Sequence, residues 1–458
     1  MTTERTQQEF RFKGQGRREI VARFDGGTIT SDGGAVLLAE AEERTRIVER
    51  FAICFRDQRS PERVEHTVCE LAMQRVLGLC LGYEDLTDHD SLRTDPLLAA
   101  LSGKSDPRAT LAGKSTLSRL ELSTAAVDRY KKLALDTQAV DRLLVDVFLE
   151  SSDEAPERIV IDLDATDFAI HGLQEGRFFH GYYDHYCYLP LYVFCGEHLL
   201  CARLRRSNID ASAGALDELV PIVERVRARW PKTKILVRAD SGFCREEIMA
   251  WCEAHDVDYV LGIARNSRLL EMINYELGMA AMEFAATNRA ARRFCELEYR
   301  TLDTWSRSRR VIAKAEYLAD KENPRFVVTS LGLDDGDARK IYEEIYCARG
   351  DMENRIKEQQ LDLFADRVSA RTMRANQVRL YFASVAYTLM HALRRLGLAG
   401  TELENAQCGT IRLRLLKIGA QIRITVRRVW VAMSQAFPLQ DLFATTLANV
   451  RARAAPAG

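Results

Sequence analysis

The sequence predicts an α/β protein with a helical N-terminal domain and a basic helical C-terminal region. Between residues 151 and 265, short apolar strands alternate with amphipathic helices, as in a mixed sheet with helices on its faces. Apolar residues before this segment recur at helical spacing. Residues 367–458 contain 14 Lys or Arg and 3 Asp or Glu, although the net charge of the whole chain is -1. This asymmetry predicts an interaction surface in the basic part.

The predicted N-terminal domain, residues 1–150, begins with a short β-hairpin. Residues 20–25 alternate apolar and polar side chains and end at Gly26-Gly27, a turn signal. A second turn, Ser31-Asp-Gly-Gly, precedes a helical pattern, and Pro61 stands at the first turn of another predicted helix, where proline is tolerated. The remaining segments are expected to be helical: 61–82, 85–101 and 123–149.

The predicted core comprises residues 151–265 and 333–365. Its expected order is β-β-β-α-β-α-β, with these bounds: strands 159–164, 188–195 and 198–205, helix 212–229, strand 234–240, helix 244–254 and strand 258–263. Residues 266–332 are interpreted as a β-rich insertion with three antiparallel strands. A helix is expected from about residue 337 to 360, followed by the basic helical region 366–458.

Composition excludes several classes of protein. A hydrophobic fraction of 47% and a charged fraction of 29% exclude disorder as the main state. The apolar run 380–393 is shorter than the roughly 20 residues of a membrane span, and the first residues lack the apolar core of a signal peptide. Eleven cysteines without a CxxC pair favour reduced thiols over zinc knuckles. We therefore expect a cytoplasmic protein without a membrane partner.

Aspartates end two of the predicted strands. Asp162 and Asp164 are two residues apart, so they point to the same face, and Asp240 ends another strand. Functional residues of open α/β sheets gather at such strand ends. Neighbouring carboxylates repel unless a cation lies between them, and oxygen ligands suit Mg²⁺ or Mn²⁺. The alternative is that each aspartate caps a helix or a turn.

The predicted helix 337–360 supplies a possible third acid. Tyr346, Arg349, Glu353 and Lys357 follow at steps of three and four and share one helix face. They could form an ordinary ion-paired surface stripe. Alternatively, Glu353 completes a three-carboxylate metal site while the cations and the tyrosine contact phosphates, for which an arginine fork is suited.

These residues together resemble Asp-Asp-Glu insertion-sequence transposases, and more specifically the 1380 family of bacterial insertion-sequence transposases. The resemblance extends from about residue 20 to beyond 390 and rests on the following motifs: Phe24-Asp-Gly-Gly, Ser31-Asp-Gly-Gly-Ala, Gly82-Tyr-Glu-Asp-Leu-Thr-Asp-His-Asp, Leu117-Ser-Arg-Leu-Glu121, Asp164-Ala-Thr, Arg238-Ala-Asp240-Ser-Gly-Phe243, Tyr346-x-x-Arg349-x-x-x-Glu353 and Arg349-Gly-Asp-Met-Glu-Asn-Arg-Ile-Lys-Glu358. One position departs: the signature lysine seven residues after the glutamate is Gln360 here, and Lys357 lies four residues after it.

The resemblance implies an RNase H-like catalytic core with a β-rich insertion. The residues alone leave the first acid open among Asp162, Asp164 and Asp167. The family's Asp-x-Thr pattern favours Asp164, with Asp162 in reserve, so the resemblance implies that Asp164, Asp240 and Glu353 hold Mg²⁺ or Mn²⁺, as two ions. The side chains expected to contact DNA are Tyr346, Arg349, Lys357, Arg238 and Trp305. The implied activity is metal-dependent strand cleavage and strand transfer of the chain's own insertion sequence.

The implied partners are transposon-end DNA, bound by the N-terminal domain, and target DNA. A homodimer is expected in the synaptic complex. The resemblance also implies a bacterial protein that associates with the nucleoid when it is bound to DNA. No nucleotide cofactor is expected. The alternatives are an RNase H-like nuclease or resolvase and a non-catalytic DNA-binding relic.

Other motifs carry less weight. Gly113-Lys-Ser-Thr resembles the end of a P-loop, but Arg108 stands where the first glycine is needed, and no GxSxG elbow supports serine catalysis. His180, Asp184 and His185 lie in an aromatic segment interpreted as a loop at the core edge, although its aromatics could stack on bases. Trp305 either stacks on a terminal base or anchors the insertion.

Overall fold

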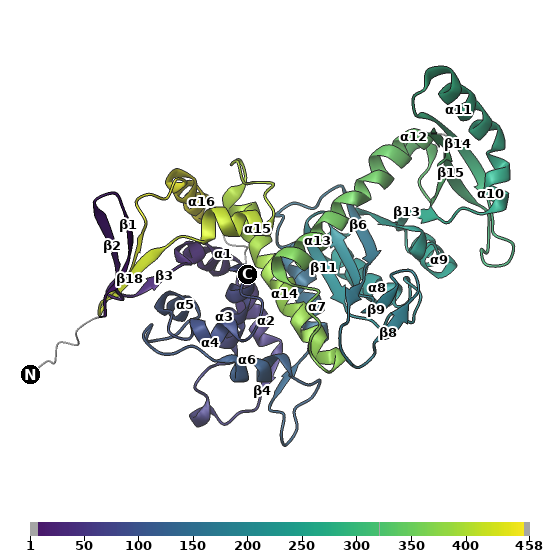
Figure 1. The fold of residues 1–458 in the computed structure, drawn as a ribbon. Coiled ribbons are helices and arrows are strands. Elements are labelled where there is room, and N and C mark those ends of the chain that lie inside the picture. The colour runs from purple at the N-terminus through teal and green to yellow at the C-terminus, as the bar shows by residue number, and fades with distance from the viewer. Residues whose placement is uncertain (1–7, 320, 453–458) are drawn as a thin grey trace, which may run out of the picture. The chain divides into compact units, whose positions relative to one another are not determined.

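A computed structural model describes residues 8–319 and 321–452. Residues 1–7 of the predicted N-terminal domain, 453–458 of the predicted basic region and Asp320 lie outside the described residues. The chain divides into two compact units. The outer unit comprises residues 1–134 and 385–458, and the central unit comprises residues 135–384. Helix α14 (Met373–Leu393) runs from the central unit into the outer one (Figure 1).

The central unit is built on one large sheet. Its strand order is β11-β10-β6-β12-β13-β17-β15-β14, and β16 pairs with β15. Strand β6 is antiparallel to β10 and parallel to β12, which is parallel to β13, while β17 and β15 continue antiparallel. The strands are β6 (Arg158–Ala165), β10 (Leu191–Cys195), β11 (His198–Arg203), β12 (Lys234–Ala239), β13 (Asp258–Ile263), β14 (Ala291–Tyr299), β15 (Arg309–Leu318), β16 (Lys321–Glu322) and β17 (Arg325–Thr329).

Helices cover this sheet because its side chains alternate between two apolar faces. Ile161 and Leu163 belong to the larger core, shared with helices α7 to α11, whereas Val160 and Leu236 pack against α12 and the π-helical turn η5. The helical elements of the unit are α7 (Thr137–Leu149), α8 (Ala215–Arg229), η3 (Ser241–Phe243), α9 (Glu246–Ala254), α10 (Ser267–Met272), α11 (Asn274–Thr287), η4 (Leu333–Asp335), α12 (Ala338–Lys340), η5 (Ile341–Tyr346), η6 (Cys347–Arg349) and α13 (Gly350–Leu363).

A small three-stranded sheet follows β6. Its order is β7-β9-β8, with β7 (Phe168–Ala169), β8 (Phe178–His180) and β9 (His185–Tyr188) all antiparallel. Strands β8 and β9 form a hairpin from the aromatic segment that the sequence suggested was a loop. Because β7 begins four residues after Asp164, this small sheet starts at the end of the strand that carries the first predicted acid.

Two predicted segments differ from the structure. The antiparallel strands expected in a β-rich insertion, residues 266–332, are present and extend the main sheet next to β13, and the segment also contains α10 and α11, which were not predicted. Helix α7, expected in the N-terminal domain, packs on the core of the central unit, so the unit boundary lies at residue 134 instead of 150. The sequence did not show this because the apolar face of α7 does not identify its packing partner.

The outer unit is formed by both ends of the chain. Strand β3 pairs with β18 of the C-terminal part, and α1 packs on α16. Its elements are β1 (Phe10–Gln15), β2 (Arg18–Ala22), β3 (Ile29–Thr30), η1 (Gly33–Ala35), α1 (Val36–Thr45), α2 (Ile47–Ile53), β4 (Phe55–Asp57), η2 (Pro61–Arg63), α3 (Val68–Cys80), α4 (Asp88–Leu92), α5 (Pro96–Leu101), α6 (Lys114–Glu121), β5 (Leu133–Leu135), η7 (Arg394–Leu398), α15 (Cys408–Ile411), η8 (Arg412–Leu416), β18 (Ala420–Ile424), β19 (Val429–Met433) and α16 (Gln440–Ala452).

The Ser31-Asp-Gly-Gly motif joins the N-terminal and C-terminal segments that form the outer unit. A Cβ atom on Gly34 would lie 2.2 Å from the carbonyl oxygen of Leu415, so only glycine fits this contact. The buried Asp32 accepts a hydrogen bond from the Tyr83 hydroxyl at 2.6 Å and pairs with Lys417 at 2.7 Å. The motif is therefore a packing device in this structure.

No helix among residues 8–319 and 321–452 has the length and apolar character needed to cross a membrane.

Candidate active site

Strand β6 carries both candidates for the first acid on one face of the main sheet. Asp162 is buried, and both its carboxylate oxygens contact the guanidinium of Arg238, at 2.5 and 2.8 Å. Arg238 also donates a hydrogen bond to the carbonyl of Ile345. Burial raises the pKa of Asp162, and Arg238 opposes this shift. Asp162 is thus held in an internal ion pair.

Arg238 was expected to contact DNA, and its position does not agree with that expectation. Its side chain is buried, and its guanidinium is engaged with Asp162 and with Ile345 in the turn before α13. Register explains the placement: Arg238 and Asp162 are paired neighbours on parallel strands, so their side chains share one face. In this conformation, Arg238 connects the sheet to the helical layer instead of facing a phosphate.

Asp164 lies two residues further along the same face. Its Oδ1 accepts a hydrogen bond from the Ala165 N–H at 3.0 Å, and its Oδ2 lies 3.6 Å from Nη1 of Arg349. Burial raises the pKa of Asp164 to about 7; the charge of Arg349 opposes this shift, whereas the charges of Asp240 and Glu353 add to it. Asp164 is therefore a half-buried acid whose two strongest carboxylate neighbours are the other two predicted acids.

Asp240 follows β12 and caps the short helix η3. Its Oδ1 accepts a hydrogen bond from the Gly242 N–H at 2.8 Å. Strands β12 and β6 are parallel, and Ala239, the last residue of β12, pairs with Leu163. Asp240, the residue after β12, therefore lies level with Asp164. The two predicted aspartates are thus brought to the same end of adjacent strands.

Glu353 lies in the first turn of α13, on the helical layer that faces these strands. Its Oε1 contacts Nη2 of Arg349 at 2.6 Å, and its side chain is 43% exposed. Arg349 therefore lies between two of the three acids, with Asp164 on one side and Glu353 on the other. The three carboxylates come from three elements: Arg349 contacts Asp164 and Glu353, and the charge of Asp240 acts on Asp164 and Arg349. Asp164, Asp240 and Glu353 are therefore the candidate acidic site.

The helix that brings Glu353 here is not continuous. In place of one helix from 337 to 360, the chain forms α12, the π-helical turn η5 and the 3₁₀ turn η6 before α13 begins at Gly350. Turns of the π type inside helices occur frequently at functional sites. Apolar periodicity could not predict it, because a π turn changes the hydrogen-bond pattern without changing the residue types.

Tyr346 ends the π-helical turn and points at the sheet. A Cβ atom at position 262 would lie 2.6 Å from the Tyr346 hydroxyl, so Gly262 on β13 permits this close approach. Burial raises the pKa of Tyr346, Arg349 lowers it and the charge of Asp240 raises it, which places the phenol beside the acidic site. Lys357, by contrast, is exposed one turn beyond Glu353.

Trp305 was expected to stack on DNA or to anchor the insertion. The ring is 4% exposed, packs edge-on against Tyr299 at 5.7 Å between ring centroids, and lies under the guanidinium of Arg309 at 5.4 Å. It has no open face for a base in this structure. The arrangement favours the anchoring interpretation.

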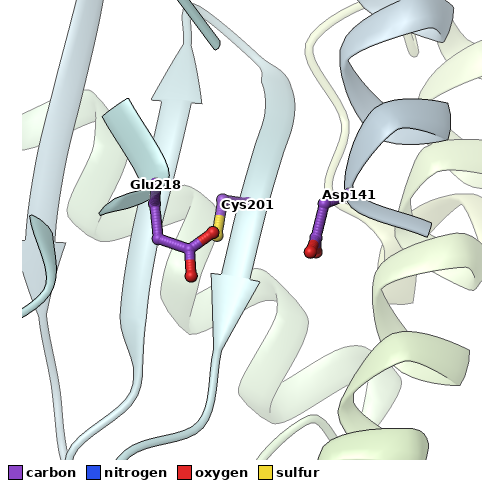
Figure 2. A group of neighbouring side chains, drawn as sticks. All are labelled: Asp141, Cys201 and Glu218. Atoms are coloured by element: carbon purple, nitrogen blue, oxygen red, sulfur yellow. The ribbon is translucent and has the colours of Figure 1, made fainter. Parts of the chain in front are cut away.

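A second group of potential metal ligands lies elsewhere in the central unit. Asp141 of α7, Cys201 of β11 and Glu218 of α8 converge within 4.8 Å of one another (Figure 2). The guanidinium of Arg203 already lies among them, 2.5 Å from Asp141 and 2.6 Å from Glu218. Burial also raises the pKa of the Cys201 thiol well above its usual value, so no thiolate is offered. This group is an arginine-centred ion pair beside a cavity of about 470 Å³.

The basic C-terminal region uses several of its arginines internally. Arg394 and Arg412 donate hydrogen bonds to backbone carbonyls of the outer unit, at 3.0 and 2.8 Å. Arg423, Arg427 and Arg428 are instead exposed on the β18–β19 hairpin, where Arg423 and Arg428 flank the ring of Trp430. Three exposed arginines of the predicted basic region thus lie on this hairpin, and other exposed ones, among them Arg371 and Arg414, lie elsewhere.

One contact beside the acidic site was not predicted from the sequence. Asp167, three residues after Asp164, accepts a hydrogen bond from Nε2 of His185 at 2.7 Å. Burial, together with the charges of Asp167 and Asp164, raises the pKa of Tyr183. The density of aromatic and histidine residues in 178–188 was the signal that could have found this contact.

Comparison with known proteins identifies the family. The family described as transposase DDE domain group 1 matches residues 12–455. The chain belongs to this transposase family. No curated protein sequence matches the chain. Among solved structures, the piggyBac transposase synaptic complex with hairpin DNA is similar at 9% sequence identity, covering 84% of this chain and 80% of that chain, with a TM-score of 0.43.

Proposed function

We propose that this member of the DDE transposase family catalyses divalent-metal-dependent cleavage and strand transfer at the ends of its own insertion sequence. The observation that carries the proposal is the convergence of Asp164, Asp240 and Glu353 around Arg349. The order β11-β10-β6-β12-β13, with β6 central and the first acid on it, supports an RNase H-like core.

The acidic site suits a divalent cation. Its donors are carboxylate oxygens, the ligands preferred by Mg²⁺ and Mn²⁺. Burial raises the pKa of Asp164 and the charges of Asp240 and Glu353 add to the shift, and a cation between the acids would offset their repulsion. DDE transposases use divalent metal ions. Asp164, Asp240 and Glu353 would hold them, whereas Asp162 already has Arg238 as its counter-charge. Two bound ions would supply Lewis-acid activation of an in-line displacement at phosphorus.

The remaining residues of the site position the DNA strand. Arg349 can move its fork from Glu353 to a phosphate, because its contact with Asp164 is loose at 3.6 Å. The Tyr346 hydroxyl beside Asp240 can donate a hydrogen bond to a non-bridging oxygen. We assign no phosphate contact to the buried Arg238 and Trp305. The β18–β19 hairpin would bind the DNA backbone without sequence preference, and pairing of two ends would require two copies of the chain.

The proposal is tested by cleavage of labelled DNA taken from the flanks of the gene, with Mg²⁺ or Mn²⁺. Asp240→Asn is expected to lower the cleavage rate on the order of a thousandfold or more, because the three acids act as a unit, while DNA binding persists. The matched control is Glu218→Gln, which neutralises an acid of the second group and should leave cleavage unchanged.

Other outcomes would identify the alternatives. Cleavage without joining to a supplied target plasmid would indicate a nuclease or a resolvase. Binding without cleavage in either metal, even with paired ends, would indicate a DNA-binding relic. Cleavage retained in Asp164→Asn, Asp240→Asn and Glu353→Gln alike would refute the site.

A further inference from the structure

The β8–β9 hairpin exposes a row of aromatic side chains on its outer face. Phe179 and Tyr186 are a cross-strand pair whose rings meet edge-on at 5.7 Å, with 54% and 44% of each residue exposed. The guanidinium of Arg177 covers the Tyr186 ring at 4.6 Å from its centroid. Tyr182, in the turn between the strands, is 85% exposed. We call this group of four residues the aromatic platform: Arg177, Phe179, Tyr182 and Tyr186.

The inner face of the same hairpin is fixed beside the acidic site. Alternation along β9 turns His185 inward, where its Nε2 bonds Asp167 at 2.7 Å, and Cys187 is buried. The main chain between β6 and β7 spans only residues 166 and 167, so the hairpin pairs with the segment that directly follows Asp164. The small sheet and the hydrogen bond from His185 to Asp167 therefore connect the aromatic platform to the segment that follows Asp164.

The charges around the platform are suited to a polyanion. Arg206 is exposed, and a Cβ atom on the neighbouring Gly176 would lie 3.3 Å from its side chain. Arg177 covers an exposed ring, and Arg206 lies beside the adjacent Gly176. Cations next to exposed aromatic rings are the combination by which proteins bind single-stranded nucleic acid, because cations contact the backbone and aromatic faces stack on bases. A patch for a second protein would not need to lie at the end of the strand that carries Asp164.

We propose that the aromatic platform binds an unpaired base of the DNA strand that enters the acidic site. The inference rests on the proposed function, since it assigns a further DNA contact to the same site. Stacking would hold a base out of the duplex next to Asp164, so that the adjoining phosphate can reach the acids. Base–aromatic stacking tolerates any sequence, so the platform would select unpaired DNA instead of a particular base.

The test compares the binding of two metal-free DNA probes by fluorescence anisotropy: a blunt duplex and the same duplex with a short single-stranded thymidine tail. Wild-type protein should prefer the tailed probe. Tyr186→Ala should weaken binding of the tailed probe by about 5–50-fold, as expected for the loss of one stacked base, and leave blunt-duplex affinity within about a factor of two. Tyr186→Phe, which keeps the ring, should behave as wild type.

Tyr275→Ala is the matched control, because Tyr275 is 75% exposed on α11 of the same unit and is not part of the platform. It should change neither affinity. A fluorescent adenine analogue placed in the tail should be quenched by wild type and by Tyr186→Phe, but not by Tyr186→Ala. An unchanged melting temperature would show that each variant is folded.

Three results would overturn the inference. These are equal loss of affinity for both probes, no loss for either, and self-association of wild type that Tyr186→Ala abolishes, which would assign the face to a second copy of the chain. Failure of the proposed function looks different. Wild type would then bind no DNA, or would bind it without cleavage in either metal, whatever the variants do.

Discussion

Two clusters in the central unit combine acids with one arginine, and they lie on opposite faces of the main sheet. Cys201 pairs with Val193, which pairs with Leu163, so the Arg203 cluster lies on the core face opposite Asp164. In that cluster Arg203 contacts both acids at 2.5–2.6 Å and the Tyr381 hydroxyl at 2.9 Å. In the acidic site, the guanidinium of Arg349 lies 2.6 Å from the carboxylate of Glu353 and 3.6 Å from that of Asp164. The negative charge of Asp240 adds to the rise in the pKa of Asp164.

The difference shows that a group of acids is informative only together with its counter-charge. The Arg203 cluster has the ligand types of a metal site, but its carboxylates are satisfied by a guanidinium and a phenol. The acidic site has one arginine for three carboxylates. Burial raises the pKa of Asp164, the charge of Arg349 opposes this shift, and the charges of Asp240 and Glu353 add to it. Excess negative charge held in place by a fold indicates a binding site for cations.

The largest expected stability effect concerns the closed cluster. Arg203→Met should destabilise the protein by about 3 kcal/mol, because it leaves Asp141 and Glu218 without their shared cation. For a unit of this size, the melting temperature should fall by about 6–12 °C. Thermal unfolding followed by circular dichroism measures the change.

The matched variant is Arg349→Met, measured at pH 6. It should cost about 1 kcal/mol or less, because Glu353 is half-exposed and because Asp164, with a pKa of about 7, is already mostly protonated at pH 6 and needs no counter-charge. Equal losses for the two arginines would contradict the distinction between a closed and an open cluster.

A smaller effect of opposite sign is expected when Asp164 is neutralised. Its pKa is about 7 in the folded chain and near 3.8 when unfolded. Between these values the folded state binds the extra proton, so wild-type stability falls as pH rises from about 4 to 7. Asp164→Asn avoids that fall and should be more stable than wild type by about 2 kcal/mol at pH 8, but not at pH 4.

Melting curves across this pH range measure the effect. The control is Asp141→Asn, which removes an acceptor of Arg203 and of the Tyr381 hydroxyl and should lower the melting temperature. If Asp164→Asn were less stable than wild type at pH 8, the contacts of the Asp164 carboxylate would be stabilising, as those of the Asp141 carboxylate with Arg203 and the Tyr381 hydroxyl are expected to be.

The smallest expected effect separates the two clusters by metal binding. Millimolar Mg²⁺ at pH 8 should stabilise wild type by on the order of 1 kcal/mol, since only the folded chain holds the acids together. Glu218→Gln should retain this stabilisation and Asp240→Asn should lose it. Loss in Glu218→Gln with retention in Asp240→Asn would place the cation in the other cluster.

The sequence predicted most of the central fold because its strands are short apolar runs with turn signals. The predicted strand 258–263 coincides with β13, and the predicted strand 159–164 lies within β6. Asp164, Asp240 and Glu353 were predicted from strand ends, helix phase and resemblance, and the structure brings them together. Their roles in catalysis stay predictions.

What the sequence could not provide depends on contacts between distant residues. A buried arginine and a phosphate-binding arginine look alike in sequence, and Arg238 proved to be internal because register places it beside Asp162. The same limit applies to Trp305 and to the π-helical turn before Arg349. The Asp167–His185 pair was missed because its partners lie 18 residues apart.

The division of the outer unit between the two ends of the chain has a consequence for the order of events during synthesis. Gly34 packs on Leu415 and β3 pairs with β18, so residues 1–134 emerge from the ribosome long before their packing partners exist. At about 5–20 residues per second, the intervening unit takes on the order of tens of seconds to make. The central unit is complete in sequence first, and a chain that stops before residue 385 carries the acids without an assembled outer unit.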